Sequence, residues 1–308
     1  MTYRLLVLDL DGTVMGDDLQ IHPAVLTAIQ RAREMGVTVT LATGRAYESA
    51  VTFAQRLEIT SPIVCYQGGL IRDPLTGEIL HLETYPTSLA LELMEWVDGR
   101  LRRPFTSLAG TRASLEPWVN LPLEPGQIEV AMFVDSMMYL ETVHGGTDFW
   151  LRYFGQQVQQ VDSLAAALQQ DPMKSMLIAW PATCDEVLPE FKAAFEGRLQ
   201  IVRSHPLFIE AVPPGVSKGR AVARLAEHLG ISRSETIAVG DNENDLTMVE
   251  WAGLGVAMGN ATPEVKSAAD WVAPSVAEDG VAEVVERFIL QAAVERGSAC
   301  RQSTEEVY

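Results

Sequence analysis

Short, unbroken apolar runs separated by stretches of helical periodicity constrain the fold of this chain more than any other feature. Three such runs, Leu5–Leu8, Val37–Ala42 and Ile63–Tyr66, have the length and composition of strands buried on both faces. Between them lie residues 22–35 and 46–57, in which apolar residues recur at helical spacing. The order strand, helix, strand, helix, strand predicts a parallel α/β sheet.

The same alternation resumes after the segment Pro213-Pro214-Gly215. It predicts a helix at 218–229, a strand at 236–239, a helix at 244–252, a strand at 254–257 and a helix at 281–295. The residues before this segment follow another pattern, with predicted helices at 87–100 and 185–195, strands at 130–140, 176–180, 208–212 and around Val202, and a proline-rich loop at 104–128. We therefore predict an α/β core from residues 1–83 and 213–308, split by an inserted domain at 84–212.

Length, charge and cysteine content narrow the class of protein. The 308 residues fit roughly two domains. A net charge of −18 argues against nucleic-acid and membrane partners, because both are usually bound through a basic face. The three cysteines, an odd number, suit reduced thiols. The apolar run before Asp9 is too short for a signal peptide, and no run approaches the ~18 residues of a membrane span. We predict a soluble, cytoplasmic protein.

Four aspartates follow predicted strands. Asp9 and Asp11 follow the first strand, and Asp241 and Asp245 follow the strand at 236–239. Ligands of open parallel sheets bind outside the carboxyl ends of the strands, so these acids belong to a binding edge. Clustered carboxylates repel one another and need a cation, and hard oxygen ligands favour Mg²⁺ over zinc.

Three further residues would add donors for an anion at the same edge. Thr43 and Gly44 follow the strand at 37–42, and Lys218 begins a predicted helix. A hydroxyl, a glycine N–H and an ammonium group suit an anion with several oxygens. Carboxylates, Mg²⁺ and such donors together are typical of phosphoryl transfer.

Four motifs resemble those of the haloacid dehalogenase superfamily of phosphotransferases, in the same order. They are DLDGT at 9–13, ATGR at 42–45, GVSKG at 215–219 and GDNEND at 240–245. VAMGNA at 256–261 and EDGVAE at 278–283 are similar to the Cof-like, type IIB sugar-phosphatase group. The resemblance implies a Rossmann-like, doubly wound core with an α+β cap of the C2 type, subclass B. The 84–212 insertion lies where that cap belongs.

The resemblance also implies roles for individual residues. Asp9 would be the nucleophile that forms an aspartyl-phosphate, and Asp11 the general acid and base. Asp9, the backbone carbonyl of Asp11, Asp241 and Asp245 would hold Mg²⁺. The phosphate would be bound by Thr43, Gly44, Lys218 and Asn244, with Lys218 also acting in catalysis by neutralising charge. Asp241, Asp245 and Thr43 could alternatively cap helices, and Arg45 suits either a salt bridge or a substrate contact.

Some positions depart from the group or stay open. Gln67 and Val276 stand where group members usually have asparagine, on the leaving-group side. His144 and His205 in the cap could meet a substrate, although lone histidines are more often structural. We interpret Trp96, Trp118, Trp150 and Trp180 as cap core rather than as a platform for sugars.

The predicted function is Mg²⁺-dependent hydrolysis of small phosphomonoesters, such as sugar phosphates or related phosphorylated metabolites. Two alternatives stay open. A phosphomutase would use the same motifs but would need a second phosphate site in the cap, where the basic cluster is limited to Arg100, Arg102 and Arg103. A non-catalytic phosphate-binding regulator would be expected to lack Asp9, Asp11 or Asp241, and all three are present.

Overall fold

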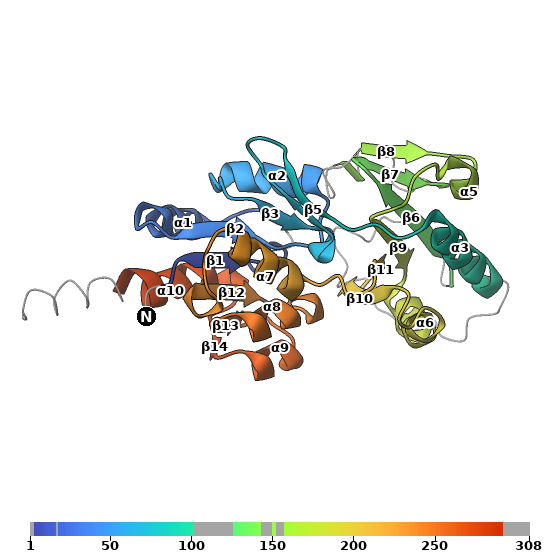
Figure 1. Cartoon of the computed structure of the whole chain (residues 1–308). Helices are drawn as coiled ribbons and strands as arrows, with labels where there is room; N and C mark the ends of the chain where they lie inside the picture. The colour runs from blue at the N-terminus through green and yellow to red at the C-terminus, as the bar shows by residue number, and fades with distance from the viewer. Residues whose placement is uncertain (1–2, 17, 102–125, 143–149, 152–156, 292–308) are drawn as a thin grey trace, which may run out of the picture.

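The described residues form three sheets, of which the two larger ones lie side by side, each with its own helices (Figure 1). The computed structural model describes residues 3–16, 18–101, 126–142, 150–151 and 157–291. The first sheet is parallel throughout and has the strand order β14-β13-β12-β1-β2. Its strands are β1 (Leu5–Leu8), β2 (Thr38–Leu41), β12 (Thr236–Gly240), β13 (Leu254–Ala257) and β14 (Trp271–Val272).

Helices cover both faces of this sheet because its strands are apolar on both sides. Leu6 and Leu8 of β1 belong to the apolar cluster formed with α1 (Pro23–Glu34), α2 (Tyr47–Arg56) and α10 (Gly280–Val285). Leu5 and Val7 belong to the opposite cluster, with α7 (Lys218–His228) and α8 (Leu246–Trp251). Helix α10 continues as a π-helical turn at Glu286–Leu290, and α9 spans Pro263–Ala268. The predicted doubly wound α/β fold is confirmed.

A small antiparallel sheet extends the core next to β2. Its strands are β3 (Ile63–Cys65), β4 (Leu70–Arg72) and β5 (Ile79–Leu82), and a bridge between Ala42 and Val64 joins it to the parallel sheet. The turn Tyr66–Gly68 between β3 and β4 is a 3₁₀ turn, as are Arg233–Glu235, Glu243–Asp245 and Val276–Glu278. The hairpin of β4 and β5 was not among the predicted elements.

The cap contains the second sheet, a mixed one with the order β10-β11-β9-β6-β7-β8. Its strands are β6 (Ile128–Val134), β7 (Met137–Leu140), β8 (Gln157–Gln160), β9 (Lys174–Ala179), β10 (Gln200–His205) and β11 (Phe208–Val212). Helices α3 (Thr87–Leu101) and α6 (Pro181–Ala194) pack on one face of this sheet, and α5 spans Leu164–Ala167. Figure 1 shows these helices on the side away from the core.

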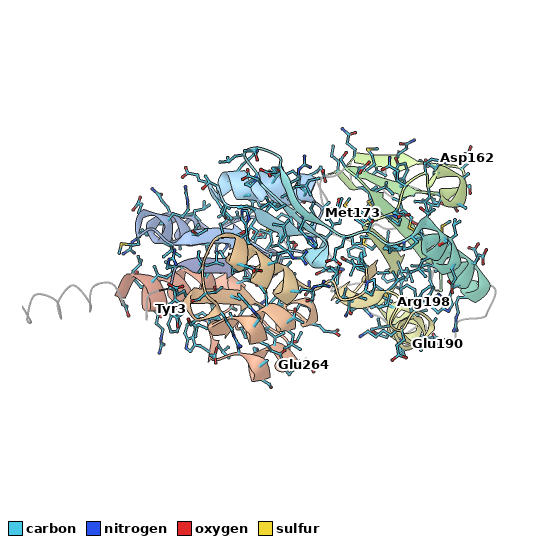
Figure 2. The ribbon with its side chains drawn as sticks, in the orientation of Figure 1. Tyr3, Asp162, Met173, Glu190, Arg198 and Glu264 are labelled. Atoms are coloured by element: carbon cyan, nitrogen blue, oxygen red, sulfur yellow. The ribbon has the colours of Figure 1, made fainter. Side chains whose placement is uncertain are left out.

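The other face of the cap sheet meets the core. Phe133 of β6 lies edge-on to Tyr66, with 6.1 Å between ring centroids, and both belong to one apolar cluster that crosses the boundary. Met173, labelled in Figure 2, belongs to that cluster where the two parts approach each other. Trp96 of α3, in contrast, is partly buried and packs on Phe191 and Phe195 against the apolar cluster beneath the cap helices.

Several predicted elements differ from the structure in extent. The predicted strand at 130–140 is a hairpin, because Asp135 adopts a left-handed φ of 51° and turns the chain between β6 and β7. Helix α6 begins at Pro181, four residues before the predicted start, because proline suits the first helical turn. Strands β8 and β14 and helix α9 were not predicted, and they are short or polar. Most of the loop predicted at 104–128 lies outside the described residues, and so do Trp118 and His144.

Among the described residues, no helix is both long enough and apolar enough to span a membrane. Cys65 and Cys184 are buried free thiols.

The segments 83–86 and 213–217 connect the two sheets, and the domain boundaries at 84 and 212 stay a prediction. We expect a variant in which a short flexible linker replaces 84–212 to fold, because every strand of the parallel sheet lies outside that segment. Circular dichroism and thermal unfolding would measure this. A single cooperative transition is the expected result, and loss of all cooperative structure would show that the boundaries are wrong.

Candidate active site

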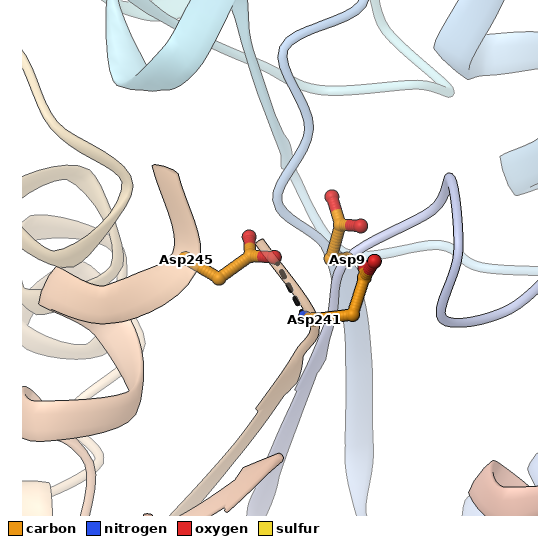
Figure 3. Close-up of side chains that lie close together, drawn as sticks. All are labelled: Asp9, Asp241 and Asp245. Carbon is orange, nitrogen blue, oxygen red and sulfur yellow. Dashed lines mark hydrogen bonds between the residues drawn. The ribbon is translucent and has the colours of Figure 1, made fainter. Parts of the chain in front are cut away.

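Neighbouring parallel strands bring the acidic side chains together. Strands β1 and β12 pair in parallel with Leu8 opposite Val239, so Asp9 and Asp241 leave the sheet at the same edge. Carboxylate oxygens of Asp9, Asp241 and Asp245 all lie within 4.8 Å of one another (Figure 3). The sequence prediction that these acids form one cluster therefore agrees with the geometry.

A buried lysine lies between two of these acids. Ser217 caps α7, its hydroxyl accepting the Arg220 N–H, so the helix begins at Lys218. The Lys218 ammonium donates to Asp9 Oδ1 and Asp245 Oδ1, each at 2.5 Å, and its side chain is 1% exposed. Burial alone would lower the pKa of Lys218, but the carboxylates of Asp245 and Asp9 outweigh it and raise that pKa. The lysine is therefore held as a cation.

Asp245 also organises the loop that carries Asp241. Its Oδ2 accepts the backbone N–H groups of Asp241 at 2.9 Å and Asn242 at 3.0 Å, and the first of these bonds is drawn in Figure 3. Since Oδ1 is engaged by Lys218, both oxygens already have partners in the protein. The helix-capping alternative therefore applies in part to Asp245, which forms a capping box with Asn242. It does not apply to Asp241.

The carboxylates of Asp9 and Asp241 lie close together, and a bound cation would offset the repulsion between them. Burial is the largest cause that raises the pKa values of Asp9 and Asp241, and the negative charge of Asp245 is the second. The pKa of Asp9 lies well above its usual range, and the pKa of Asp241 is about 7. Asp241 is fixed by the Thr13 hydroxyl, 3.0 Å from its Oδ1, and by contact with Gly12, where a Cβ would collide with its carboxylate. Hard oxygen atoms in this arrangement could hold a divalent ion.

The loop after β2 supplies donors opposite the acids. Thr43 is buried, and its hydroxyl oxygen accepts the Arg45 N–H at 3.1 Å, so its own proton is left to donate elsewhere. The side-chain amide of Gln67 packs against Gly44 at the position a Cβ would occupy. Thr43 and Gly44 line the same cavity as Asp9, as the sequence predicted for phosphate donors.

Arg45 forms a salt bridge with Asp11 and also lines the cavity. Its Nε and Nη2 donate to the two oxygens of Asp11 at 2.7 and 2.6 Å, while Nη1 donates to Ser49. The guanidinium also lies 5.3 Å from the centre of the Phe53 ring. Burial acts to raise the pKa of Asp11, but the charge and hydrogen bonds of Arg45 lower it overall.

The cap closes the cavity from the other side. The cavity measures about 140 Å³ and is lined on the cap side by Lys174, Ser204, His205, Phe208 and Glu210. Burial lowers the pKa of His205 to about 4, and its ring lies 4.9 Å from that of Phe208. Only His205 was considered from the sequence. Lys174 and Glu210 were missed, although ionisable residues in otherwise apolar strands are a signal for them.

Gln67 and Val276, the two positions that depart from the group's usual asparagine, lie in different places relative to the cavity. Gln67 lines the cavity, and its side-chain oxygen accepts from Asn244 at 3.0 Å. Asn244 Oδ1 is buried and has no hydrogen-bond partner among the described residues, so it could accept from a ligand. Val276 is not among the residues that line the cavity, and its N–H donates to Asn260.

Comparison with known proteins agrees with this geometry. A family model for haloacid dehalogenase-like hydrolases matches residues 6–285. The chain belongs to this family. The predicted superfamily, fold class and enzyme class are confirmed for this haloacid dehalogenase-like hydrolase, whereas the roles of single residues stay predictions.

Individual relatives match along nearly their whole length. YxeH of Bacillus subtilis (strain 168) is 31% identical over 94% of this chain and 99% of its own. YbhA of Escherichia coli (strain K12), named a pyridoxal phosphate phosphatase, is 27% identical over 92% of this chain and 98% of its own. The solved structure of the subclass IIB sugar phosphatase BT4131 has a TM-score of 0.73 and covers 92% of this chain and 98% of that one; at 20% identity the likeness concerns the fold.

Removing one acid should stabilise the metal-free hydrolase at high pH. The folded-state pKa of Asp241, about 7, lies above its ordinary value of 3.8, so its contribution to stability is present near pH 4 and lost as pH rises through 7. We expect Asp241→Asn in excess chelator to melt about 2–4 °C above the parent at pH 8, with a smaller difference at pH 5. Mg²⁺ should raise the melting temperature of the parent more than that of the variant. Asp162→Asn, an exposed change in the cap, is the control, and equal responses in all three proteins would contradict the metal site.

His205 should make the hydrolase less stable in acid. Its folded-state pKa of about 4 lies below the ordinary 6.5, so the stability that neutral His205 supplies is complete above pH 6.5 and is lost as pH falls towards 4. Denaturant unfolding of the parent and of His205→Phe should therefore diverge between pH 7 and pH 5, by up to about 2 kcal/mol. His228→Gln, at an exposed position, should show no such divergence. Parallel curves for His205→Phe and the parent would show that His205 is not buried in its neutral form.

Proposed function

We propose that this hydrolase is a Mg²⁺-dependent phosphatase that cleaves small phosphomonoesters through an aspartyl-phosphate on Asp9. The observation that carries the proposal is the position of the Asp9 carboxylate. It lies at the lining of the cavity, is held by Lys218, and shares the cavity with Thr43 and Gly44. A phosphoryl group bound by those donors would meet a carboxylate fixed as a nucleophile.

The chemistry divides between the two aspartates of the DLDGT motif. One Asp9 oxygen would form a bond to phosphorus as the bond to the leaving oxygen breaks, and water would later cleave the aspartyl-phosphate. Asp11 would donate a proton to the leaving oxygen and then accept one from that water. In the structure both Asp11 oxygens accept from Arg45. For Asp11 to act as an acid, at least one of these hydrogen bonds must be released as substrate enters.

Asp9 and Asp241, with the backbone carbonyl of Asp11, would hold the ion, and Asp245 would orient the loop that carries Asp241. Mg²⁺ supplies positive charge that offsets the negative charge on the phosphoryl oxygens. Lys218 adds a fixed charge beside Asp9, so that the incoming phosphate and this carboxylate repel each other less.

The cavity favours a small leaving group. Its volume is about 140 Å³, and His205 and Phe208 offer an aromatic wall on the cap side. The relative YbhA acts, by its name, on a phosphorylated metabolite with a flat ring. We therefore propose small phosphorylated metabolites as substrates.

The phosphomutase alternative is disfavoured by the charges in the cavity. The two cationic side chains that line the described cavity, Arg45 and Lys174, are each paired with a carboxylate, so neither is free to hold a second phosphate. The absence of nucleic-acid partners stays a prediction from the net charge, and cytoplasmic location stays a prediction from the cysteine content and the short apolar runs.

Replacing Asp11 should separate the two proton transfers. In Asp11→Asn, Asp9 should still attack the phosphorus of p-nitrophenyl phosphate, because nitrophenolate leaves with little need for protonation. The aspartyl-phosphate should then be hydrolysed slowly, because no base at position 11 accepts a proton from the attacking water. We expect a burst of nitrophenolate approaching one equivalent per enzyme, followed by turnover about 10²–10⁴-fold below the parent. Rapid-mixing absorbance measurements would record both phases.

The controls for this experiment are a second variant and a second substrate. Asp9→Asn should abolish both phases, because no nucleophile remains. A sugar phosphate should give Asp11→Asn little burst, since its alkoxide needs the missing acid. Parent-like turnover of both substrates by Asp11→Asn would disprove the role of Asp11, and activity of the parent after exhaustive chelation would disprove the need for a metal.

A further inference from the structure

A buried ion pair from the cap lies against the loop that follows β2. Lys174 and Glu210 are 1% and 4% exposed, and their charged atoms are 3.3 Å apart. Alternation along β9 and β11 places both side chains on the sheet face that meets the core. The Lys174 ammonium also donates to the backbone carbonyl of Gly44 at 3.0 Å and lies 4.4 Å from the centre of the Phe133 ring. The ammonium thus has a carbonyl, a carboxylate and an aromatic ring as partners within the protein.

Glu210 is equally well partnered. One of its oxygens accepts from the Ser204 hydroxyl at 2.6 Å, and the other accepts from the side-chain amide of Gln67 at 3.1 Å and faces Lys174. A carboxylate with these partners needs no ligand to satisfy it. The pair therefore serves the protein's own structure, although both residues line the cavity.

Gln67 connects this ion pair to the two loops that carry phosphate-side residues. Its oxygen accepts from Asn244, its amide packs on Gly44, and its backbone N–H donates to the carbonyl of Thr43 at 3.1 Å. The residue has a left-handed φ of 60°, which costs energy for a side chain with a Cβ and places it between the loops. An asparagine here would be one methylene shorter and would not reach both Glu210 and Asn244.

The carbonyl that Lys174 holds belongs to a peptide with a direct role at the site. The same peptide unit, Gly44–Arg45, contributes the N–H that donates to the Thr43 hydroxyl oxygen. Fixing this peptide fixes which way the Thr43 hydroxyl points its own proton. A cation supplied by the cap thereby sets the orientation of a donor supplied by the core.

We propose that Lys174 is a positioning residue for the phosphate site: together with Glu210 and Gln67 it holds the Thr43–Gly44 turn in its binding orientation, so that the core site is complete only with the cap in place. The proposal rests on the proposed phosphatase function. It assigns Lys174 no contact with substrate.

Lys174→Met tests the proposal, with Lys192→Met as a matched control. Lys192 also forms an ion pair across the boundary, with Glu243 at 3.3 Å, but both side chains are exposed and neither is among the residues that line the cavity with Gly44. We expect Lys174→Met to raise KM for p-nitrophenyl phosphate and Ki for inorganic phosphate about tenfold or more, with a smaller change in kcat. Amide hydrogen exchange of the segments 43–45 and 66–67 should become faster. Lys192→Met should leave all three quantities near those of the parent.

A double variant separates positioning from simple neutralisation of Glu210. Lys174→Met leaves a buried carboxylate without its cation, which lowers stability. Adding Glu210→Gln removes that charge, so Lys174→Met/Glu210→Gln should regain most of the melting temperature. The high Ki for phosphate and the fast exchange at 43–45 should persist, because Gly44 still lacks its donor. If Lys174→Met alone does not fold, the double variant still tests the proposal.

Two results would overturn the proposal. One is recovery of phosphate affinity together with stability in the double variant, and the other is parent-like exchange and Ki in Lys174→Met. Failure of the proposed function has a different signature: the parent itself would hydrolyse no phosphomonoester with Mg²⁺. In that case the exchange rates at 43–45 still decide whether Lys174 holds the turn.

Discussion

The charge of Lys218 underlies the arrangement of the whole acidic edge. Three aspartates from two loops lie within 4.8 Å, and such crowding of like charges in a buried place is unfavourable without a cation. Lys218 supplies that cation from the first turn of α7, the end of a helix where the macrodipole disfavours positive charge. The hydrogen bonds to Asp9 and Asp245 offset this cost. Helix, lysine and acids therefore depend on one another, and a change in any of them would disturb the other two.

The sequence was informative wherever one residue type has one dominant physical role. Buried parallel strands require continuous apolar runs, so β1, β2, β12 and β13 were predicted within a few residues. Because the carboxyl ends of such strands share an edge, the grouping of Asp9, Asp241, Thr43 and Lys218 followed from order alone. The β4–β5 hairpin and β8 were missed, since their patterns are short and their side chains largely half-buried or exposed.

The ion pairs and contacts between the cap and the core could not be predicted from the sequence, for a different reason. Lys174 and Glu210 are far from the core motifs along the chain. The register between β9 and β11 places them close to each other, and the meeting of cap and core places Lys174 beside Gly44. The pairing of Arg45 with Asp11 likewise depends on how two loops meet in space. The periodicity of the sequence indicates which residues are buried. It does not indicate which residue a buried side chain contacts, because that depends on packing between segments distant in the sequence.

Gly12 and Gly44 have a consequence for binding that concerns entropy. At each glycine, a functional side chain lies directly on bare backbone: the Asp241 carboxylate on Gly12 and the Gln67 amide on Gly44. A side chain confined in this way has few rotamers left, and ordering a long side chain costs up to about 2 kcal/mol. That loss of freedom occurs when the chain folds, not when a ligand arrives. These two side chains are therefore ordered before any ligand binds, and little of the free energy of binding is needed to order them.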